Sequence, residues 1–170
     1  MEQIAEIVKL FCKDIFREIT IRQISKSIKK SYAYTNKEVW GLVEKGVLKE
    51  KKIGNSVVCS INISSESARA LLSFNSFLEK EEYFKKNEDV KSKIAHLINE
   101  SKEKGVFTAF LVKNELVLVC FDKSVFKGSE LKAKIITQDE FSSFIKNSGF
   151  DNLVVYGYEK YWESIGDIYG

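Results

Sequence analysis

The chain has 170 residues, of which 44% are apolar and 30% are charged, with a formal net charge of +3 and no proline. This length fits one ordinary domain or two small ones, and the balance of apolar and charged residues excludes a disordered chain. The apolar runs are far shorter than the roughly 20 residues that cross a bilayer, and the N-terminus lacks the pattern of an export signal. The composition therefore predicts a soluble, cytoplasmic protein with no membrane partner.

The charge is divided unevenly along the chain. Residues 1–64 hold 12 Lys and Arg against 7 Asp and Glu, a net of +5, whereas residues 65–170 hold 15 against 17, a net of −2. This division indicates an anion-binding module joined to a part with another task. The three cysteines, Cys12, Cys59 and Cys120, lie far apart among apolar neighbours, so we interpret them as buried thiols.

Three helices and a hairpin are predicted in residues 1–64. Apolar residues recur every three or four positions over residues 2–13, which predicts the first helix. Thr20, followed by Gln23, has the capping-box pattern that begins a second helix, and a third follows the polar break at residues 30–31. Its exposed face is predicted to carry Tyr34, Thr35, Lys37 and Trp40. After Gly46 the period changes to two, which predicts strands on both sides of a turn at Gly54-Asn55.

These segments carry a resemblance to a known family. TIRQISKSI at 20–28, SYAYT at 31–35 and the run from Val39 to Leu48 resemble the winged helix-turn-helix of archaeal and bacterial transcription regulators of the MarR/ArsR type. The resemblance implies that the helix starting near Ser31 enters the major groove of DNA and that the hairpin is the wing. It places DNA contacts at Ser31, Tyr32, Tyr34, Thr35, Asn36 and Lys37, and phosphate or minor-groove contacts at Lys51, Lys52 and Asn55.

Each of these contacts has a plainer alternative. Tyr32 and Tyr34 would instead pack the elbow of the helix-turn-helix, and the hairpin lysines would be a solvated edge that discourages strand pairing. A winged helix can also serve as a protein-docking module. The net +5 of residues 1–64 favours a phosphate partner, so DNA binding is the leading hypothesis.

A long helix is predicted to follow the wing, from the capping residues 64–66 to about Lys85. Its two apolar stripes are Ala68, Leu71, Phe74 and Leu78, and Ala70, Phe77 and Phe84. So broad an apolar arc predicts more than one neighbour. In the resembled family a helix after the wing commonly mediates homodimerisation, so residues 65–87 either pair two copies or pack between the two modules of one chain.

Residues 88–170 are predicted to form a module of helix, three strands, helix, short strand and helix. The predicted elements are a helix at 90–104, a hairpin at 106–112 and 115–121, a strand at 131–136, a helix between Thr137 and Gly149, a strand at 152–158 and a helix at 159–165. His96, the only histidine, has no ligand at metal-binding spacing and is interpreted as a structural or surface residue.

This module is similar to the minimal nucleotidyltransferase domain of prokaryotes in the segments 135–141 and 153–162. That family uses a Gly-Ser turn for the triphosphate and an Asp-x-Asp pair for Mg²⁺. Here Gly128-Ser129 follows both strands, and Glu115 stands alone with Asp122 beyond the strand end. The resemblance therefore implies a degenerate domain without catalytic residues, metal or cofactor.

The sequence thus predicts an α+β fold with a winged helix (1–64), a linking helix (65–87) and a small nucleotidyltransferase-like α/β domain (88–170). The predicted function is a DNA-binding transcription regulator whose non-catalytic C-terminal domain senses a ligand or partner. The alternatives are a nucleotidyltransferase with an eroded site that uses Glu115 and Asp122, and a winged-helix protein-interaction module. The predicted partners are double-stranded DNA and a second copy of the chain. The absence of proline favours short connections, so the two modules would move as one body.

Overall fold

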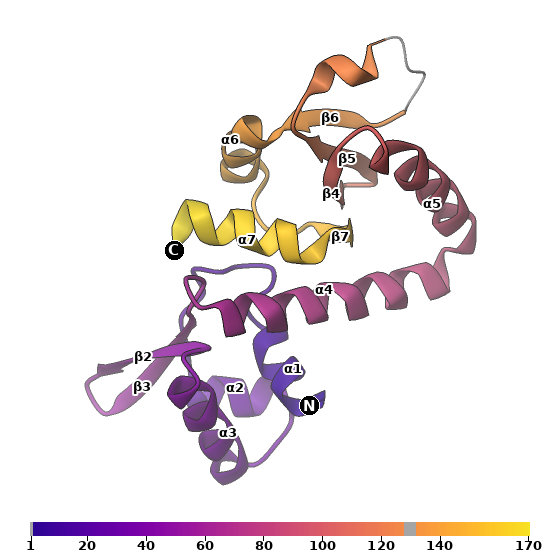
Figure 1. Cartoon of the computed structure of the whole chain (residues 1–170). Helices are drawn as coiled ribbons and strands as arrows, with labels where there is room; N and C mark the ends of the chain where they lie inside the picture. The colour runs from indigo at the N-terminus through magenta and orange to yellow at the C-terminus, as the bar shows by residue number, and fades with distance from the viewer. Residues whose placement is uncertain (1, 128–131) are drawn as a thin grey trace.

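The N-terminal part consists of three helices and a small antiparallel sheet in the computed structural model, which describes residues 2–127 and 132–170 (Figure 1). Helices α1 (Glu2–Lys9), α2 (Ile21–Ser27) and α3 (Tyr32–Glu44) precede the hairpin of β2 (Leu48–Ile53) and β3 (Ser56–Ile61). The two-residue strand β1 (Ile19–Thr20) pairs with β3, so the strand order is β1-β3-β2. This is the winged helix-turn-helix topology that the sequence predicts.

Local signals set the bounds of these elements. The Thr20 hydroxyl accepts from the Gln23 amide at 3.2 Å, and Gln23 Oε1 accepts from the Thr20 amide at 2.8 Å, so the predicted capping box is confirmed. The predicted turn is confirmed as well, with Gly54 at a φ of +57°. The first helix is shorter than predicted, because residues 10–13 form turns.

Helix α4 (Glu66–Lys86) lies between the winged helix and the C-terminal part, as Figure 1 shows. Its Ala68 and Leu72 are buried in the core. The predicted stripes are wrong in part: Phe74, Phe77 and Leu78 are 40–45% exposed, whereas polar Ser73, Asn75 and Ser76 are buried. The small polar residues allow close approach of α7 (Tyr158–Tyr169), and their hydrogen-bonding groups find partners there or on α4 itself.

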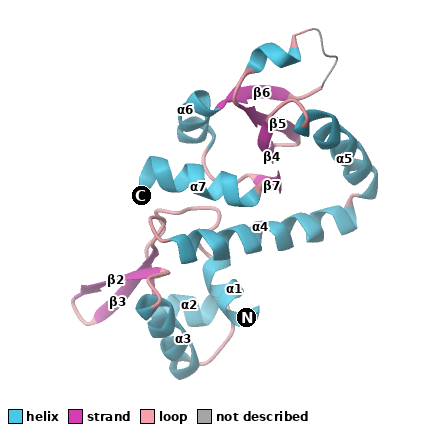
Figure 2. Cartoon of the chain, viewed as in Figure 1, coloured by secondary structure: helices cyan, strands magenta, loops and turns pink. Residues whose placement is uncertain are grey.

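The C-terminal part has a four-stranded mixed sheet with helices around it (Figure 2). Its elements are α5 (Glu88–Lys102), β4 (Val106–Val112), β5 (Glu115–Cys120), the 3₁₀ helix η1 (Lys123–Phe126), β6 (Lys134–Thr137), α6 (Gln138–Ser148), β7 (Leu153–Tyr156) and α7. The sheet order is β6-β5-β4-β7, and β5 and β6 are parallel while the other pairs are antiparallel. The predicted element order is confirmed. Leu131, the predicted start of the third strand, lies outside the described residues.

One hydrophobic core passes through both parts of the chain. It includes Ile7 and Leu42 from the winged helix and Phe110, Tyr161 and Trp162 from the C-terminal part. The Trp162 indole Nε1 donates to Ser76 Oγ at 2.9 Å, which fixes α7 on α4. The predicted boundaries at residues 64 and 87 stay predictions, because the packing is continuous across them. None of the described helices is both long and apolar enough to span a membrane.

Candidate nucleic-acid interface

Helix α3 turns its inner face to the core and leaves an outer face free. Val39 and Leu42 are buried, while Tyr32 is 54% exposed, Trp40 is 39% exposed and Lys37 is also exposed. Ser31 caps the helix, and its hydroxyl oxygen accepts from the Tyr34 amide at 3.3 Å. A helix exposed along one side from its first turn can be placed against a groove of DNA.

Thr35 does not belong to this face, and the prediction that it is exposed is wrong. Its side chain is fully buried, and its hydroxyl donates to the Ser31 carbonyl at 2.9 Å. Thr35 precedes Val39 and Leu42 by one and two helical turns, so it falls on the core-facing side of α3. A contact between Thr35 and DNA would require this helix to leave the core.

The other residues of α3 that are predicted to contact DNA are intermediate in exposure between Thr35 and Lys37. Asn36 is half-buried. Tyr34 is half-buried as well, and partial desolvation, followed by the carboxylates of Glu38 and Glu6, raises the pKa of its phenol. Ala33 and Trp40, which the predicted contacts omit, are exposed beside Lys37.

The wing extends away from the rest of the molecule (Figure 1). Five of the six residues of β2 are exposed, and within the described part of the chain this edge strand pairs with β3 alone. Lys51 and Lys52 pair in register with Val58 and Val57, and Asn55 lies at the exposed tip. The predicted wing residues are therefore all accessible to a partner.

A hollow of about 300 Å³ brings the three elements together. It is lined by Arg22 of α2, Tyr32 of α3 and Asn55 at the wing tip, together with Thr20, Ile21, Ser56 and Val57. Arg22 is missing from the predicted site, although it is one of only three arginines in the chain. A guanidinium beside a phenol and an amide offers several donors to one phosphate group.

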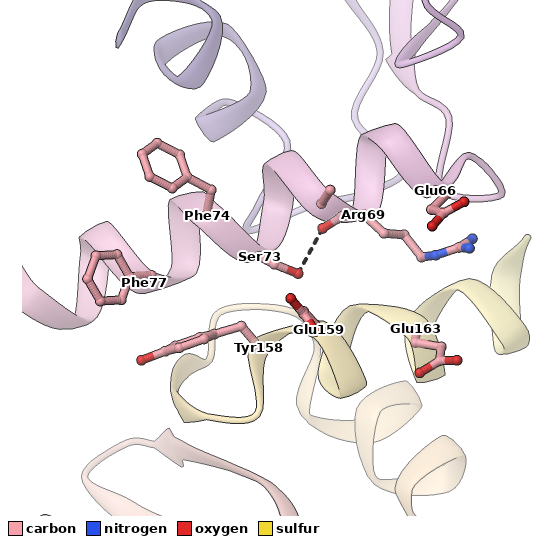
Figure 3. A pocket seen from close by; sticks show the side chains of 9 residues that line it. Glu66, Arg69, Ser73, Phe74, Phe77, Tyr158, Glu159 and Glu163 are labelled. Atoms are coloured by element: carbon pink, nitrogen blue, oxygen red, sulfur yellow. Dashed lines mark hydrogen bonds between the residues drawn. The ribbon is translucent and has the colours of Figure 1, made fainter. Parts of the chain in front are cut away.

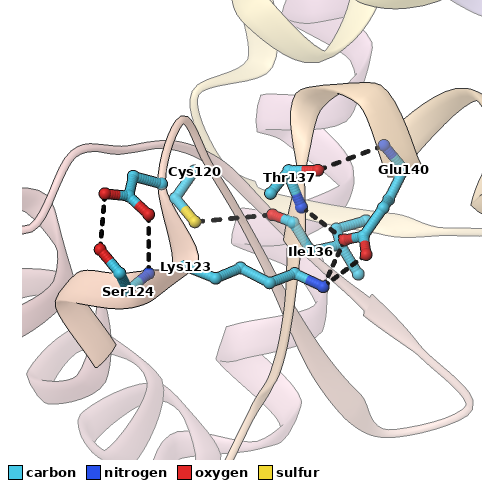
Figure 4. Close-up of polar contacts among 7 residues, drawn as sticks. Cys120, Lys123, Ser124, Ile136, Thr137 and Glu140 are labelled. Atoms are coloured by element: carbon cyan, nitrogen blue, oxygen red, sulfur yellow. Dashed lines mark hydrogen bonds and ion pairs between the residues drawn. The ribbon is translucent and has the colours of Figure 1, made fainter. Parts of the chain in front are cut away.

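The carboxylates named in the nucleotidyltransferase alternative do not share a site. Glu115 begins β5 and Asp122 follows its end, so the strand separates them by roughly 20 Å at about 3.3 Å per residue. Asp122 accepts from the Ser124 amide at 2.8 Å and from the Ser124 hydroxyl at 2.6 Å, and it caps η1 (Figure 4). Hydrogen bonds from Ser124 lower the pKa of Asp122. Gly128-Ser129 lies outside the described residues.

The nearby polar contacts are accounted for by the fold. Lys123 pairs with Glu140, and Glu140 accepts from the Thr137 amide at 2.8 Å in a second capping box (Figure 4). Cys12, Cys59 and Cys120 are buried free thiols, as predicted. His96 is exposed on α5, in agreement with its interpretation as a structural or surface residue, and its Nε2 lies 3.5 Å from Glu100 Oε1. Within residues 2–127 and 132–170, no three His, Cys, Asp or Glu side chains are placed to hold a metal ion.

Comparison with known proteins adds little. No family model matches the chain, and no curated protein matches it. Among solved structures, a zinc-responsive MarR family member of Lactococcus lactis, ZitR, is 17% identical over 59% of this chain and 75% of that chain, with a TM-score of 0.35. At this TM-score and identity, the similarity carries no function over to the chain.

Proposed function

We propose that the chain is a DNA-binding transcription regulator. The observation that carries the proposal is that Arg22 of α2, Tyr32 of α3 and Asn55 at the wing tip line one hollow, in a winged helix of net charge +5 that also exposes Lys37 on α3 and Lys51 and Lys52 on the wing. α3 would contact base edges with Tyr32, Asn36, Lys37 and Trp40. The wing and Arg22 would contact phosphates, which position the protein without reading sequence.

The C-terminal part would sense a ligand or a partner and would not catalyse a reaction. The separation of Glu115 from Asp122 by the length of β5 supports this view, because two-metal phosphoryl transfer needs carboxylates gathered around one centre. Incubation with labelled nucleoside triphosphates and Mg²⁺ should leave the chain unlabelled. Labelling that Glu115→Ala abolishes would contradict the non-catalytic proposal.

A second copy of the chain would pair through α4. Phe74 and Leu78, one turn apart, form an apolar strip 43–45% exposed on the side of α4 turned away from the core. Pairing would present two α3 helices to two half-sites of DNA.

The test is binding of duplex DNA measured by fluorescence anisotropy at several salt concentrations. Lysines that contact phosphates make affinity fall with salt, by a slope of about 0.9 per neutralised phosphate. The combined change of Lys37, Lys51 and Lys52 to alanine should weaken binding strongly and reduce the slope by about two to three.

The matched control changes Lys91, Lys93 and Lys146 to alanine, which removes the same charge from exposed positions of the C-terminal part. It should leave the affinity close to that of the unchanged chain. Equal losses in both triple variants would show that only net charge matters. An absence of DNA binding at low salt would contradict the proposal, and a stable protein complex would then favour the interaction-module alternative.

A further inference from the structure

The outer face of α3 carries a short stripe of three side chains. Ala33, Lys37 and Trp40 follow one another at intervals of four and three residues, so they lie in one line along the helix. All three are exposed, with Trp40 at 39%. Thr35 and Val39 lie on the opposite, core-facing side and are buried. The stripe is therefore the part of α3 that would meet the floor of a DNA groove.

The stripe offers few hydrogen bonds and much apolar surface. Ala33 presents only a methyl group, and Trp40 presents an indole ring with a single N–H donor. Arginine and glutamine, which form paired hydrogen bonds with guanine and adenine, are absent from α3, all of which the structure describes, and its one side-chain amide, Asn36, is half-buried. The apolar group that base pairs present in the major groove is the methyl group of thymine, which alanine and aromatic side chains contact. The chemistry of the stripe thus fits thymine.

The hollow at Arg22, Tyr32 and Asn55 indicates where the stripe would lie on DNA. Tyr32 lines this hollow and immediately precedes Ala33, so a phosphate held there by Arg22 would place the start of α3 beside the DNA backbone. Trp40 follows Ala33 by seven residues, which is about 10 Å of helix at about 1.5 Å per residue. This length equals about three base-pair steps of about 3.4 Å along the duplex. Ala33 and Trp40 would therefore reach different base pairs.

We propose that the outer face of α3 reads the methyl groups of thymines in the major groove. Ala33 contacts the methyl group of one thymine, and Trp40 contacts that of another about three base pairs away. The small side chain of Ala33 allows the helix backbone to approach the bases, and the ring of Trp40 covers the second methyl group. The inference deepens the proposed function and rests on it, because α3 must enter the major groove for either contact to form.

The experiment first finds the sequence that the full chain binds. Duplexes with a randomised segment of about 20 base pairs, long enough for two half-sites one helical turn apart, are selected for binding. Thymine in the selected duplex is then replaced by uracil, one position at a time. Uracil lacks only the methyl group and keeps every hydrogen-bonding group, so the two duplexes are a matched pair. We expect two thymines about three base pairs apart, and each replacement there should weaken binding about two- to fivefold, as the loss of one buried methyl group predicts.

Variants assign each methyl group to a side chain. In Trp40→Ala, the replacement of thymine by uracil should lose its effect at one position and keep it at the other, and in Ala33→Gly the pattern should be reversed. The control is Phe77→Ala on α4, where the ring faces Tyr158 of α7 (Figure 3). Phe77 is 40% exposed, close to the 39% of Trp40, and its removal should keep both effects. Circular dichroism verifies that all three variants are folded.

The outcomes separate this inference from the proposed function. A chain that binds no duplex at low salt overturns the proposed function and the inference with it. A chain that binds DNA but selects no thymine, or binds the thymine and uracil duplexes equally, overturns the inference alone. If Trp40→Ala weakens binding of the thymine and uracil duplexes by the same factor at every position, Trp40 contacts no methyl group and its assignment is overturned.

Discussion

Thr35 and Lys37 are two residues apart on α3, yet the structure gives them opposite environments. Thr35 is fully buried and donates to the Ser31 carbonyl, whereas Lys37 is exposed. In Thr35→Val the hydroxyl is lost and the shape is kept, so we expect a loss of about 0.5–1.5 kcal/mol in the free energy of unfolding. The DNA affinity of the folded protein should stay unchanged.

Lys37→Ala should behave in the opposite way. Its free energy of unfolding should change by less than about 0.5 kcal/mol, because the side chain lies on the surface. Its DNA affinity and salt slope should both fall. Urea unfolding and anisotropy titration on the same preparations separate the two effects, and a DNA defect in the folded Thr35→Val protein would contradict the placement of Thr35.

The buried cysteines make stability depend on pH. Burial, with a smaller effect of Glu79, raises the pKa of Cys12 to about 12, and burial with Glu50 raises that of Cys59 to about 11. In the unfolded chain the cysteine thiols deprotonate near pH 8.5. Their contribution to the free energy of unfolding is therefore complete below that pH, and it is lost as the pH rises toward the pKa values of the folded state.

The free energy of unfolding should therefore fall between pH 8.5 and 10, with Cys12 contributing a slope of up to about 1.4 kcal/mol per pH unit. Urea titrations across this range measure it. Cys12→Ala should show a shallower slope than the unchanged chain. A slope that does not depend on Cys12 would show that other groups control alkaline stability.

At the scale of elements, the backbone conformation of Gly157 allows the chain to pass from β7 into α7. Its φ of +65° is left-handed, and a Cβ there would lie 2.0 Å from the Phe107 carbonyl oxygen of β4. Gly157→Ala should cost about 2–5 kcal/mol, from left-handed strain together with the clash. Gly105, with a φ of +79°, has open space around its Cβ position, so Gly105→Ala should cost only about 1–2 kcal/mol. Similar losses in both variants, measured by urea unfolding, would refute the role of the Phe107 contact.

Elements with local signals could be predicted from the sequence almost to the residue. The capping box at Thr20, the helix between Thr137 and Gly149, and the hairpin of residues 106–112 and 115–121, whose connecting residues 113 and 114 have a positive φ, are examples. The strand β1 was missed because two residues are too few to show a period. Its pairing depends on β3, nearly 40 residues further along the chain.

The buried face of α4 was predicted wrongly for a different reason. Hydrophobic periodicity assumes that apolar residues face the core, but α7 packs so closely that Ser73 and Ser76 suit the contact better than phenylalanine. The same limit applies to the candidate site. Lys37, Lys51 and Lys52 were found from charge, whereas Arg22 and the burial of Thr35 depend on how α2, α3 and the wing meet.

At the scale of the whole molecule, α4 is packed on both parts of the chain and still leaves an apolar strip uncovered. Ala68 and Leu72 belong to the core that both parts share, so α4 packs between the two parts of one chain. Phe74 and Leu78 take no part in that core. The two roles proposed for residues 65–87 are therefore compatible, since they use different sides of one helix.

The strip provides the last prediction. If two copies pair through α4, the double change Phe74→Ser and Leu78→Ser should convert a dimer into a monomer in sedimentation equilibrium. The free energy of unfolding of the monomer should change little, because both side chains are already exposed. DNA affinity should fall much more for a site with two half-sites than for a single half-site, because only the first requires both α3 helices. The change Phe16→Ser, at a side chain that is 62% exposed beside α7, serves as the control and should leave the dimer intact. A chain that is monomeric at all concentrations before any change would refute pairing through α4 and leave this helix a role within one chain.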